Sequence, residues 1–446
     1  MKLKKVVLVV DHKNRDLDGI ALIAHHLYTK HNIFPHLTTT KNEISSLIKY
    51  QPELILIPHV RHEHQREFLT YCKEKGIKIA LSLAEGFPRQ PRDIIFSIGK
   101  KEFIPMLDLI MPWGRTLSHF CKNSPLTTGA TISETGAPRF DFHSRNLANR
   151  SQARERVCKV LSLEKNRKIV LWTTNYKYAN HPHLSDKEVI ELIKTPTNSD
   201  HRIAGTIEKK VHDHNLCHRK TSETVLKLVT NFPNVNFIVK LHPSESELSY
   251  NRYFDNCSNA HIFRDHDDLH LSDLLLAADV KIGWRCTTSA ESWLSDINSR
   301  TIDYEPDGLL LDEFSYLSSG NESASNYSEL QNRLTYYLCG GTVSQELIEI
   351  RRKFVADFLY SDDGKSAERC ADAINRLLVK QPNKYSTTLR SSSIFFRHLK
   401  DYRFNKGWVA LHRSASHDKY ISRKEVDRSM QRCSRAYNET ADYAFL

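Results

Sequence analysis

Short, largely apolar segments recur along this chain, and stretches with the spacing of an amphipathic helix lie between them. In the first 145 residues the apolar segments are residues 6–10, 54–57 and 77–83, and residues 16–28 have the first helical pattern. A continuous apolar run is typical of a strand that is buried on both faces of a parallel sheet. The alternation of such strands with helices therefore predicts an α/β fold.

The same alternation starts again in the second part of the chain, after a polar helical stretch at residues 146–161. Strands are predicted at residues 168–174, 237–241 and 279–283. A polar insertion is expected at residues 180–220 and a loop at residues 317–328. A chain of 446 residues is long enough for two domains of ordinary size. We therefore expect two Rossmann-like domains that face a cleft, followed by a basic tail, at residues 1–145, 146–380 and 381–446.

The composition is that of a soluble globular protein, with 40% hydrophobic and 26% charged residues. No stretch approaches the run of about 18 apolar residues that a membrane span requires, and Asp11 and His12 cut short the apolar N-terminus. Nine cysteines are scattered singly without a C-x-x-C pair, so neither a zinc site nor a disulfide framework is expected. These features favour a reducing cytoplasm.

The formal charge of +11 is concentrated near the end of the chain, where residues 380–446 contain 14 Lys and Arg against 6 Asp and Glu. Residues 390–413 interleave aromatic and basic side chains. This composition suits an anionic membrane surface or nucleic acid, and it also suits a solvated tail with a few aromatic residues packed on a domain. We favour peripheral membrane contact slightly over the solvated tail, and we expect no nucleic acid.

Two strands of the second domain run into polar residues that suit a phosphate-bearing ligand. Residues 237–241 lead directly into a His-Pro pair at residues 242–243, and residues 279–283 precede a Thr-Thr-Ser cluster at residues 287–289 that opens a predicted helix. Ligands of open α/β sheets bind outside the carboxyl ends of the strands. Helix N-termini present backbone N–H groups and a partial positive charge, so they bind anions. The pattern predicts a site for a donor of an activated sugar or alcohol.

Short motifs that follow one another along the first 380 residues extend this pattern. They lie at residues 11–18, 84–86, 112–114, 135–141, 172–175, 241–245, 287–291 and 363–368. Their order and spacing resemble those of bacterial surface-carbohydrate biosynthesis proteins, which are similar to glycosyltransferases of the GT-B fold. More distantly, they are similar to 3-deoxy-octulosonic acid (Kdo) transferases and to glycerophosphate transferases of wall polymers. Ala84 departs from an acidic residue that is usual in the family, and Trp284 and Arg285 stand where smaller residues are often found.

The resemblance and the residue types together suggest candidate site residues. As donor-binding residues we expect Lys240, His242, Ser244, Thr287, Thr288, Ser289 and Glu291. As acceptor-binding residues we expect Lys13, Arg15 and Asn175, with Glu85 as the catalytic base, or as a nucleophile if configuration is retained. Each has a structural alternative: a strand-end His, helix-capping hydroxyls, an acid that complements a helix dipole, a turn acid or a solvated loop. The His-rich stretches lack matched Cys or carboxylate spacing, so no metal site is expected.

The expected activity is that of a metal-independent, cytoplasmic glycosyltransferase, placed by its tail at the inner face of the membrane. The resemblance implies a nucleotide-activated sugar as co-substrate, with CMP as one expected carrier, and no further cofactor. The acceptor would be a surface polysaccharide or a lipid-linked glycan. The alternatives are a polyol-phosphate transferase or a nucleotide-sugar epimerase on the same fold, and a non-catalytic scaffold of the glycan assembly machinery.

Overall fold

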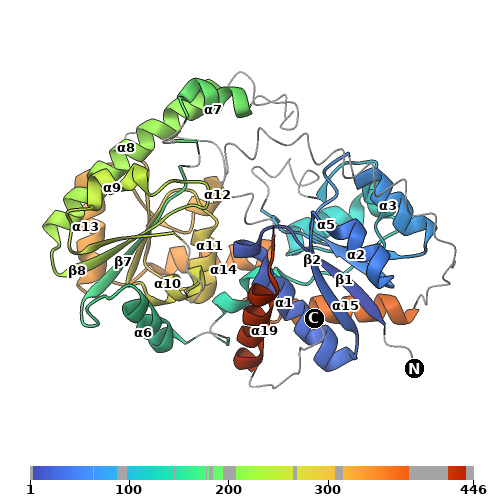
Figure 1. Ribbon diagram of the computed structural model, residues 1–446. Helices are drawn as coiled ribbons and strands as arrows, with labels where there is room; N and C mark the ends of the chain where they lie inside the picture. Colours follow the sequence, from blue (N-terminus) through green and yellow to red (C-terminus); the bar gives the residue numbers. More distant parts are fainter. Residues whose placement is uncertain are drawn as a thin grey trace. The chain divides into compact units, whose positions relative to one another are not determined.

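The computed structural model describes residues 4–63, 65–87, 98–144, 146–147, 149–176, 178–179, 184–193, 207–264, 269–306, 315–380 and 420–437. The chain divides into two compact α/β units (Figure 1). Of the described residues, the first unit contains 4–147, 353–380 and 420–437, and the second unit contains 149–352.

The first unit is built on a six-stranded sheet in which every strand pair is parallel. The strand order is β2-β1-β3-β4-β5-β6. The strands are β1 (Lys5–Val10), β2 (Phe34–Thr39), β3 (Leu54–Ile57), β4 (Lys78–Ser82), β5 (Leu109–Met111) and β6 (Thr131–Ile132). Parallel pairing requires crossover connections, which here contain α1 (Lys13–His31), α2 (Glu43–Tyr50), α3 (Gln65–Glu74) and α5 (Arg115–Asn123).

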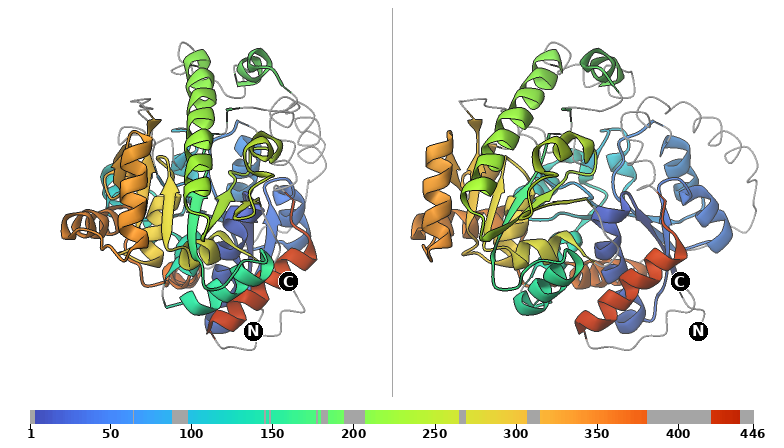
Figure 2. Two further views of the ribbon diagram at one scale, coloured as in Figure 1. Left: turned by 90° about the vertical axis from the view of Figure 1, so that its left-hand side faces the viewer. Right: turned by 60° about the vertical axis from the view of Figure 1, so that its left-hand side comes forward.

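Two helices from the end of the chain complete the core of the first unit. They are α15 (Ser366–Lys380) and α19 (Arg423–Tyr437), and both pack on α1 (Figures 1 and 2). Leu22 of α1, Ile374 of α15 and Met430 of α19 are buried in one hydrophobic cluster. Asp141 receives hydrogen bonds from the backbone N–H groups of Ser366 at 3.0 Å and Ala367 at 2.7 Å, so its carboxylate holds the first turn of α15.

This packing changes the expected division of the chain. The predicted second domain extended to residue 380, but residues 353–380 belong to the first unit, because α15 covers apolar side chains of α1. The predicted tail at 381–446 also differs, since its residues 423–437 form α19 and bury apolar side chains in the first unit. The aromatic-basic stretch at residues 390–413 lies outside the described residues.

The second unit has a second six-stranded parallel sheet, in the order β12-β11-β10-β7-β8-β9. The strands are β7 (Lys168–Thr173), β8 (Val235–Lys240), β9 (Ala260–Phe263), β10 (Val280–Gly283), β11 (Thr301–Tyr304) and β12 (Glu322–Ala324). The helices are α6 (Arg150–Val160), α7 (Asp186–Ile193), α8 (Ile207–Asn231), α9 (Leu248–Phe254), α10 (Leu271–Ala277), α11 (Thr288–Ser295), α12 (Ser315–Ser318), α13 (Tyr327–Leu338) and the first part of α14 (Gln345–Phe358), whose residues from Lys353 onward belong to the first unit.

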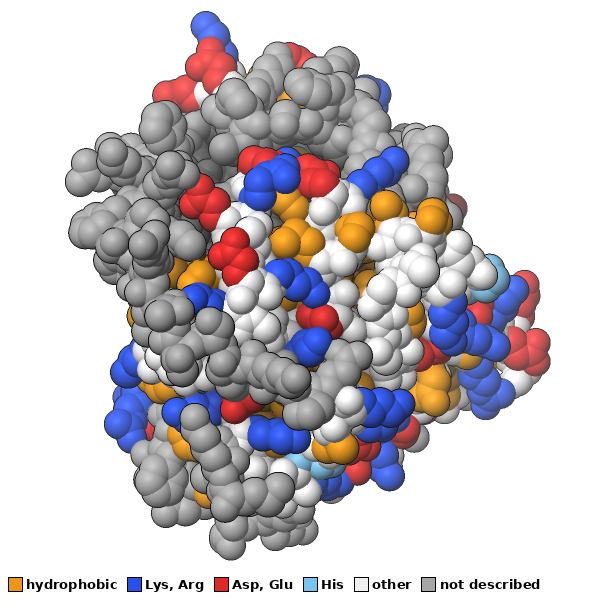
Figure 3. Space-filling model, turned by 90° about the vertical axis from the view of Figure 1, so that its right-hand side faces the viewer, with side chains coloured by type: hydrophobic (Ala, Val, Ile, Leu, Met, Phe, Trp, Pro, Cys, Tyr) orange, Lys and Arg blue, Asp and Glu red, His pale blue; other side chains and the backbone are white. Residues whose placement is uncertain are grey.

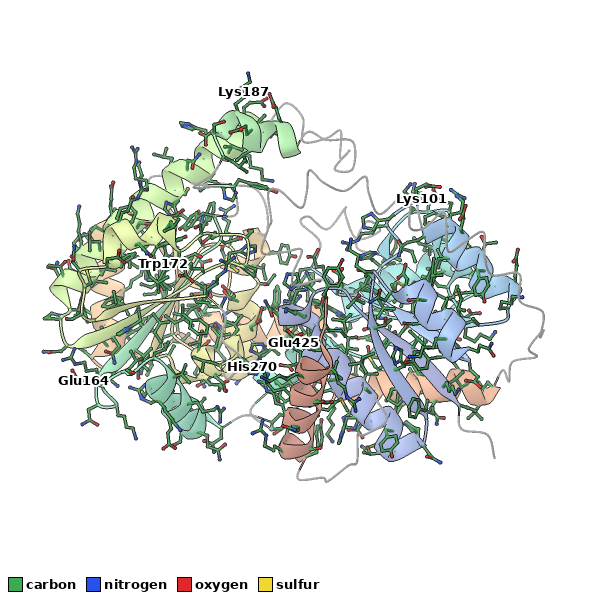
Figure 4. All side chains as sticks on the ribbon, in the orientation of Figure 1. Lys101, Glu164, Trp172, Lys187, His270 and Glu425 are labelled. Carbon is green, nitrogen blue, oxygen red and sulfur yellow. The ribbon has the colours of Figure 1, made fainter. Side chains whose placement is uncertain are left out.

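Alternate residues of the central strand β7 enter two different cores. Val170 and Trp172 pack in a cluster with side chains of α8, α9 and α13, and Trp172 is marked within this unit in Figure 4. Ile169 and Leu171 pack in a second cluster with side chains of α6 and α10. Because side chains alternate along a strand, this pattern places helices on both faces of the sheet, as in a doubly wound fold.

Two local predictions in the second unit are wrong. The polar insertion was expected to end at residue 220, but α8 already begins at Ile207, and the buried side chains Val211, His214, His218 and Thr221 follow one another in it at helical spacing. The loop expected at residues 317–328 contains β12 and the first residues of α13. None of the helices in the described part of the chain is long and apolar enough to cross a membrane.

Candidate functional site

The predicted donor residues of the second unit come together around the end of β7. The carboxyl end of this strand lies between those of β8 and β10, since the strand order is β10-β7-β8. On one side, the hydroxyl of Thr173 lies 3.0 Å from that of Thr288 at the start of α11. On the other side, the hydroxyl of Thr174 accepts a hydrogen bond from the backbone N–H of His242 at 3.0 Å. Two adjacent threonines therefore connect the His-Pro pair to α11.

The imidazole of His242 is oriented by its own turn. Residues 242–245 form a turn closed by a hydrogen bond of 2.9 Å from the N–H of Glu245 to the carbonyl of His242; we call it the His-Pro turn. Within it, the N–H of Ser244 donates to Nδ1 of His242 at 3.2 Å, and the Ser244 hydroxyl lies 2.7 Å from the same nitrogen. A nitrogen that accepts an N–H carries no proton, so the neutral ring has its proton on Nε2. The ring can then donate from Nε2.

Two cations border the His-Pro turn. The ammonium group of Lys240, at the end of β8, donates to the carbonyl of Leu241 at 2.8 Å. The guanidinium of Arg264, directly after β9, donates to the carbonyl of Pro243 at 3.1 Å. Arg264 was missed in the sequence, where the only available signal was a basic residue directly after a short apolar strand. Both side chains place positive charge at the edge where His242 lies.

The start of α11 divides into a half-buried part and a buried part. Thr287 and Thr288 are half-buried, whereas Ser289 and Glu291 are buried. The hydroxyl of Ser289 accepts hydrogen bonds from Lys281 and Asn321, each at 2.8 Å. Burial lowers the pKa of Lys281, although the nearby Asp303 opposes this shift. These contacts favour an anchoring role for Ser289 and leave the two threonines as the better candidates for ligand contact.

The bulky Trp284 is accommodated by the core. Its ring is 3% exposed and stacks on Tyr176 with centroids 5.4 Å apart. The next residue, Arg285, has a positive φ of 38° and forms a two-pronged ion pair with Glu305 at 2.6 and 3.1 Å. The large side chains in this segment therefore contact the protein interior and Glu305, which explains how the chain tolerates them after β10.

Glu85 of the first unit lies in a charge network that Arg15 dominates. The guanidinium of Arg15 donates to Glu85 at 2.6 Å, and to Asp11 and Asp16 at 2.8 Å each. Arg61 lies 3.6 Å from the same Glu85 carboxylate. Burial would raise the pKa of Glu85, but Arg15 and Arg61 outweigh it and hold this pKa at about 2. At neutral pH Glu85 is an ionised partner of Arg15, and in this state it is a weak base.

A second carboxylate near Asp11 has the opposite shift. Glu43, at the first residue of α2, is buried, and desolvation together with the charge of Asp11 raises its pKa to about 8. Asp11 thus influences two carboxylates whose environments separate their pKa values, a pattern typical of acid–base sites. His59 adds a titratable ring, 3.9 Å from Asp11. No spacing pattern in the sequence pointed to Glu43, because its environment depends on the order of the strands.

The three predicted acceptor residues have different surroundings. Lys13 is paired with Glu425 of α19 at 2.6 Å, and its side chain is 9% exposed; Figure 4 labels Glu425 on that helix. Arg15 lies in the network of Glu85. Asn175 follows β7 in the second unit, beside Thr174, and so shares a sheet edge with His242. This placement associates Asn175 with the donor residues.

The described residues contain no group of three or more His, Cys, Asp or Glu side chains placed to hold a metal ion. On the face shown in Figure 3, Lys and Arg side chains and Asp and Glu side chains lie interspersed over the described surface. The described part of this face therefore carries charges of both signs.

Comparison with known proteins identifies the fold. No protein-family model and no curated protein sequence matches the chain. Among solved structures, the wall teichoic acid polymerase TagF matches with a TM-score of 0.55 and 14% identity, over 86% of this chain and 91% of its own. The UDP-GlcNAc 2-epimerase from Neisseria meningitidis, bound to UDP-GlcNAc, matches with a TM-score of 0.54 and 12% identity, over 83% of this chain and 100% of its own. MnaA of S. aureus with UDP matches with a TM-score of 0.51 and 10% identity, over 86% of this chain and 100% of its own.

These similarities show that the chain has a GT-B-like fold of two Rossmann-like units. The fold class expected from the sequence is confirmed, and so is the expected resemblance to GT-B-like proteins at the level of fold.

Proposed function

We propose that this protein is a glycosyltransferase that moves a sugar from a nucleotide-activated donor to a surface polysaccharide or a lipid-linked glycan. One observation carries the proposal. In a GT-B-like fold, the His-Pro turn and the first turn of α11 are joined by Thr173 and Thr174 at the carboxyl edge of one sheet. This is the edge at which parallel α/β sheets bind ligands.

The donor phosphates would be bound by the positive groups at this edge. Nε2 of His242 would donate to a phosphate oxygen, with Lys240 and Arg264 nearby. The N-terminus of α11, with Thr287 and Thr288, would add partial positive charge, while Ser244 orients the imidazole and Asn175 lines the same edge. Such preorganised groups stabilise the charge that develops on a departing nucleotide. Neither a metal nor a cofactor is needed in this scheme.

The acceptor would bind at the carboxyl edge of the first sheet, near Arg15 and Glu85. Glu85 is a weak base while it is paired with Arg15. An acceptor with a phosphate or carboxylate would compete for Arg15 and weaken the attraction between Arg15 and the Glu85 carboxylate. The pKa of Glu85 would then rise, and its carboxylate could receive the proton of the acceptor hydroxyl. In this scheme the acceptor itself activates the base.

A lipid-linked acceptor would place the enzyme at the inner face of the cytoplasmic membrane. The basic and aromatic residues of the tail suit contact with anionic lipids. Among the possible carriers of the donor sugar, CMP remains an expectation from the family resemblance.

The second candidate is a nucleotide-sugar epimerase or a polyol-phosphate transferase. The solved structures of similar fold favour it, since they include a UDP-GlcNAc 2-epimerase and a wall teichoic acid polymerase. A non-catalytic scaffold is the third candidate, and Ala84 at a usually acidic position supports it.

An incubation with nucleotide sugars separates these candidates. The purified protein is mixed with CMP-, UDP- and GDP-sugars and with CDP-glycerol, with and without a lipid-linked glycan extract. A transferase releases the nucleotide only when the extract is present, whereas an epimerase converts the nucleotide sugar on its own. Conversion without acceptor would contradict the transferase proposal, and no turnover under any condition would favour the scaffold.

A further inference from the structure

A buried carboxylate, Glu245, lies directly behind the His-Pro turn. Its side chain accepts hydrogen bonds from the hydroxyl of Thr174 at 2.5 Å and from the hydroxyl of Tyr250 at 2.6 Å. It also accepts one from the backbone N–H of Tyr176. Three segments therefore meet at this carboxylate: the loop after β7, the His-Pro turn itself, and α9.

The network reaches His242 through Thr174. A hydroxyl has one proton to donate, and for Thr174 the carboxylate of Glu245 at 2.5 Å is a nearer acceptor than the carbonyl of Lys240 at 3.3 Å, so the proton is directed to Glu245. The lone pairs of the same oxygen are then directed elsewhere, and one of them accepts the backbone N–H of His242 at 3.0 Å. Glu245 thus sets the direction of the Thr174 hydroxyl, which in turn fixes the main chain where the His-Pro turn begins.

A carboxylate is a costly side chain to bury for packing alone. Burial raises the pKa of Glu245, and the donors Thr174, Tyr250 and Tyr176 oppose this rise. An apolar side chain could fill the same space beside Tyr250 without this desolvation cost. What the carboxylate provides, and an apolar side chain does not, is a fixed set of hydrogen bonds that lock two loops together.

We infer that Glu245 is a positioning residue of the donor site, which holds His242 in its phosphate-facing orientation through Thr174. The inference rests on the proposed function, because it names what aligns the imidazole of the same site. Without this contact the turn would keep its internal bonds to Ser244 but would lose its fixed position against β7.

Four variants test the inference. Thr174→Val removes the hydroxyl at nearly constant volume, and Thr174→Ser keeps it. Glu245→Gln keeps a single acceptor oxygen and puts an amide N–H₂ in place of the other, so the side chain can no longer accept from Thr174, Tyr250 and Tyr176 together. The matched control is Thr224→Val, which removes another buried hydroxyl of the second unit, 3.0 Å from that of Tyr304. For each protein we would measure the affinity for CMP, CDP, UDP, GDP and ADP, the hydrogen exchange of the His242 amide, and urea unfolding.

Thr174→Val and Glu245→Gln should each weaken nucleotide binding about tenfold and speed exchange of the His242 amide to a similar degree. Thr174→Ser should stay within about twofold of the wild type in both measurements. Thr224→Val should lose unfolding stability like Thr174→Val while affinity and exchange stay unchanged. The inference would be overturned if Thr174→Val kept the exchange rate and the affinity of the wild type. It would also be overturned if Thr224→Val changed both quantities as much as Thr174→Val does.

Hydrogen exchange separates this inference from the proposed function. If the wild type binds none of the five nucleotides, the donor site fails, yet exchange at His242 still shows whether Thr174 and Glu245 hold the turn. If Glu245→Gln does not fold, the comparison of Thr174→Val with Thr174→Ser still decides the question.

Discussion

The pairing of Glu85 with Arg15 shows how one neighbour changes what a candidate catalytic residue can do. In the sequence, Glu85 follows an apolar strand and precedes Gly86, which suits a base at a sheet edge. In the structure, its carboxylate is bound to Arg15 at 2.6 Å and its pKa is about 2. A base is most effective when its pKa lies near the working pH, so activity requires that Arg15 be drawn away.

Replacing Arg15 should therefore raise the pKa of Glu85. In Arg15→Ala the largest attractive charge on Glu85 is removed, while Arg61 and Arg139 remain and the Glu85 side chain is 58% exposed. The pKa of Glu85 should therefore rise from about 2 toward its ordinary value, as measured by carbon NMR of the side-chain carboxyl.

The control for this titration is Arg66→Ala, which removes an arginine from an exposed ion pair with Glu63. It should leave the titration of Glu85 unchanged. A Glu85 titration in Arg15→Ala that matches the wild type would show that Arg61, and not Arg15, controls this carboxylate.

Candidate site residues could be chosen from the sequence where an apolar strand is followed by a polar residue or by the start of a helix. His242 and Thr288 stood out because each follows a short apolar strand, and the structure links both to the end of β7. Glu43 and Arg264 could not be found in this way. Their positions depend on which strands are neighbours, and the pKa of Glu43 depends on Asp11, far away in the sequence.

At the scale of elements, α19 is a helix that was not predicted from the sequence. Its many polar and basic side chains led to the prediction of a basic tail. In the structure, Val426, Met430 and Cys433 form a buried stripe at helical spacing. Ion pairs join the helix to α1, from Glu425 to Lys13 and from Arg432 to Asp18. Only contact with α1 distinguishes this stripe from scattered apolar residues, so composition alone could not reveal it.

Truncating the buried Met430 should destabilise the first unit. Met430→Ala leaves a cavity between α1 and α19, and a loss of about 2–5 kcal/mol in the free energy of unfolding is expected. Urea unfolding measures this loss. The control is Val379→Ala on α15, whose side chain is 63% exposed and whose removal should change stability by less than about 0.5 kcal/mol. Equal effects of the two substitutions would mean that α19 does not pack on α1.

His26 should make this packing sensitive to acid. The ring is buried in α1 and lies edge-on to Tyr437 of α19, with ring centroids 4.8 Å apart. Burial lowers its pKa to about 4, with further lowering by His25 and Lys30. Between pH 6.5 and 4 the unfolded chain therefore binds a proton that the folded chain does not, so stability falls as the pH falls through this window.

His26→Leu should remove this contribution, which amounts to about 3 kcal/mol at the acid end of the window. Urea unfolding at pH 7 and pH 4 compares the variant with the wild type and with His119→Leu, a control at an exposed position. If His26→Leu loses as much stability between these pH values as the wild type does, His26 is not the group responsible.

For the whole molecule, the alternation of strands and helices was sufficient to predict two Rossmann-like units. It was not sufficient to predict where the units begin and end. Parallel strands buried on both faces have a strong local signature, as residues 6–10 and 237–241 show. The return of the chain to the first unit at Lys353 has no local signature in the sequence, because it depends on packing of α15 against α1, more than 300 residues earlier. Long-range packing of this kind decides to which unit a helix belongs.

The most direct test of the account is thermal unfolding of the full chain with CMP, CDP, UDP, GDP and ADP. A ligand that binds only the folded state stabilises it by about 2.7 kcal/mol at about 100 times its Kd. We expect one nucleotide to raise the unfolding temperature of the wild type and of the exposed-site control His119→Ala, and not that of His242→Ala. No rise with any nucleotide, or an equal rise in His242→Ala, would contradict a donor site at the His-Pro turn.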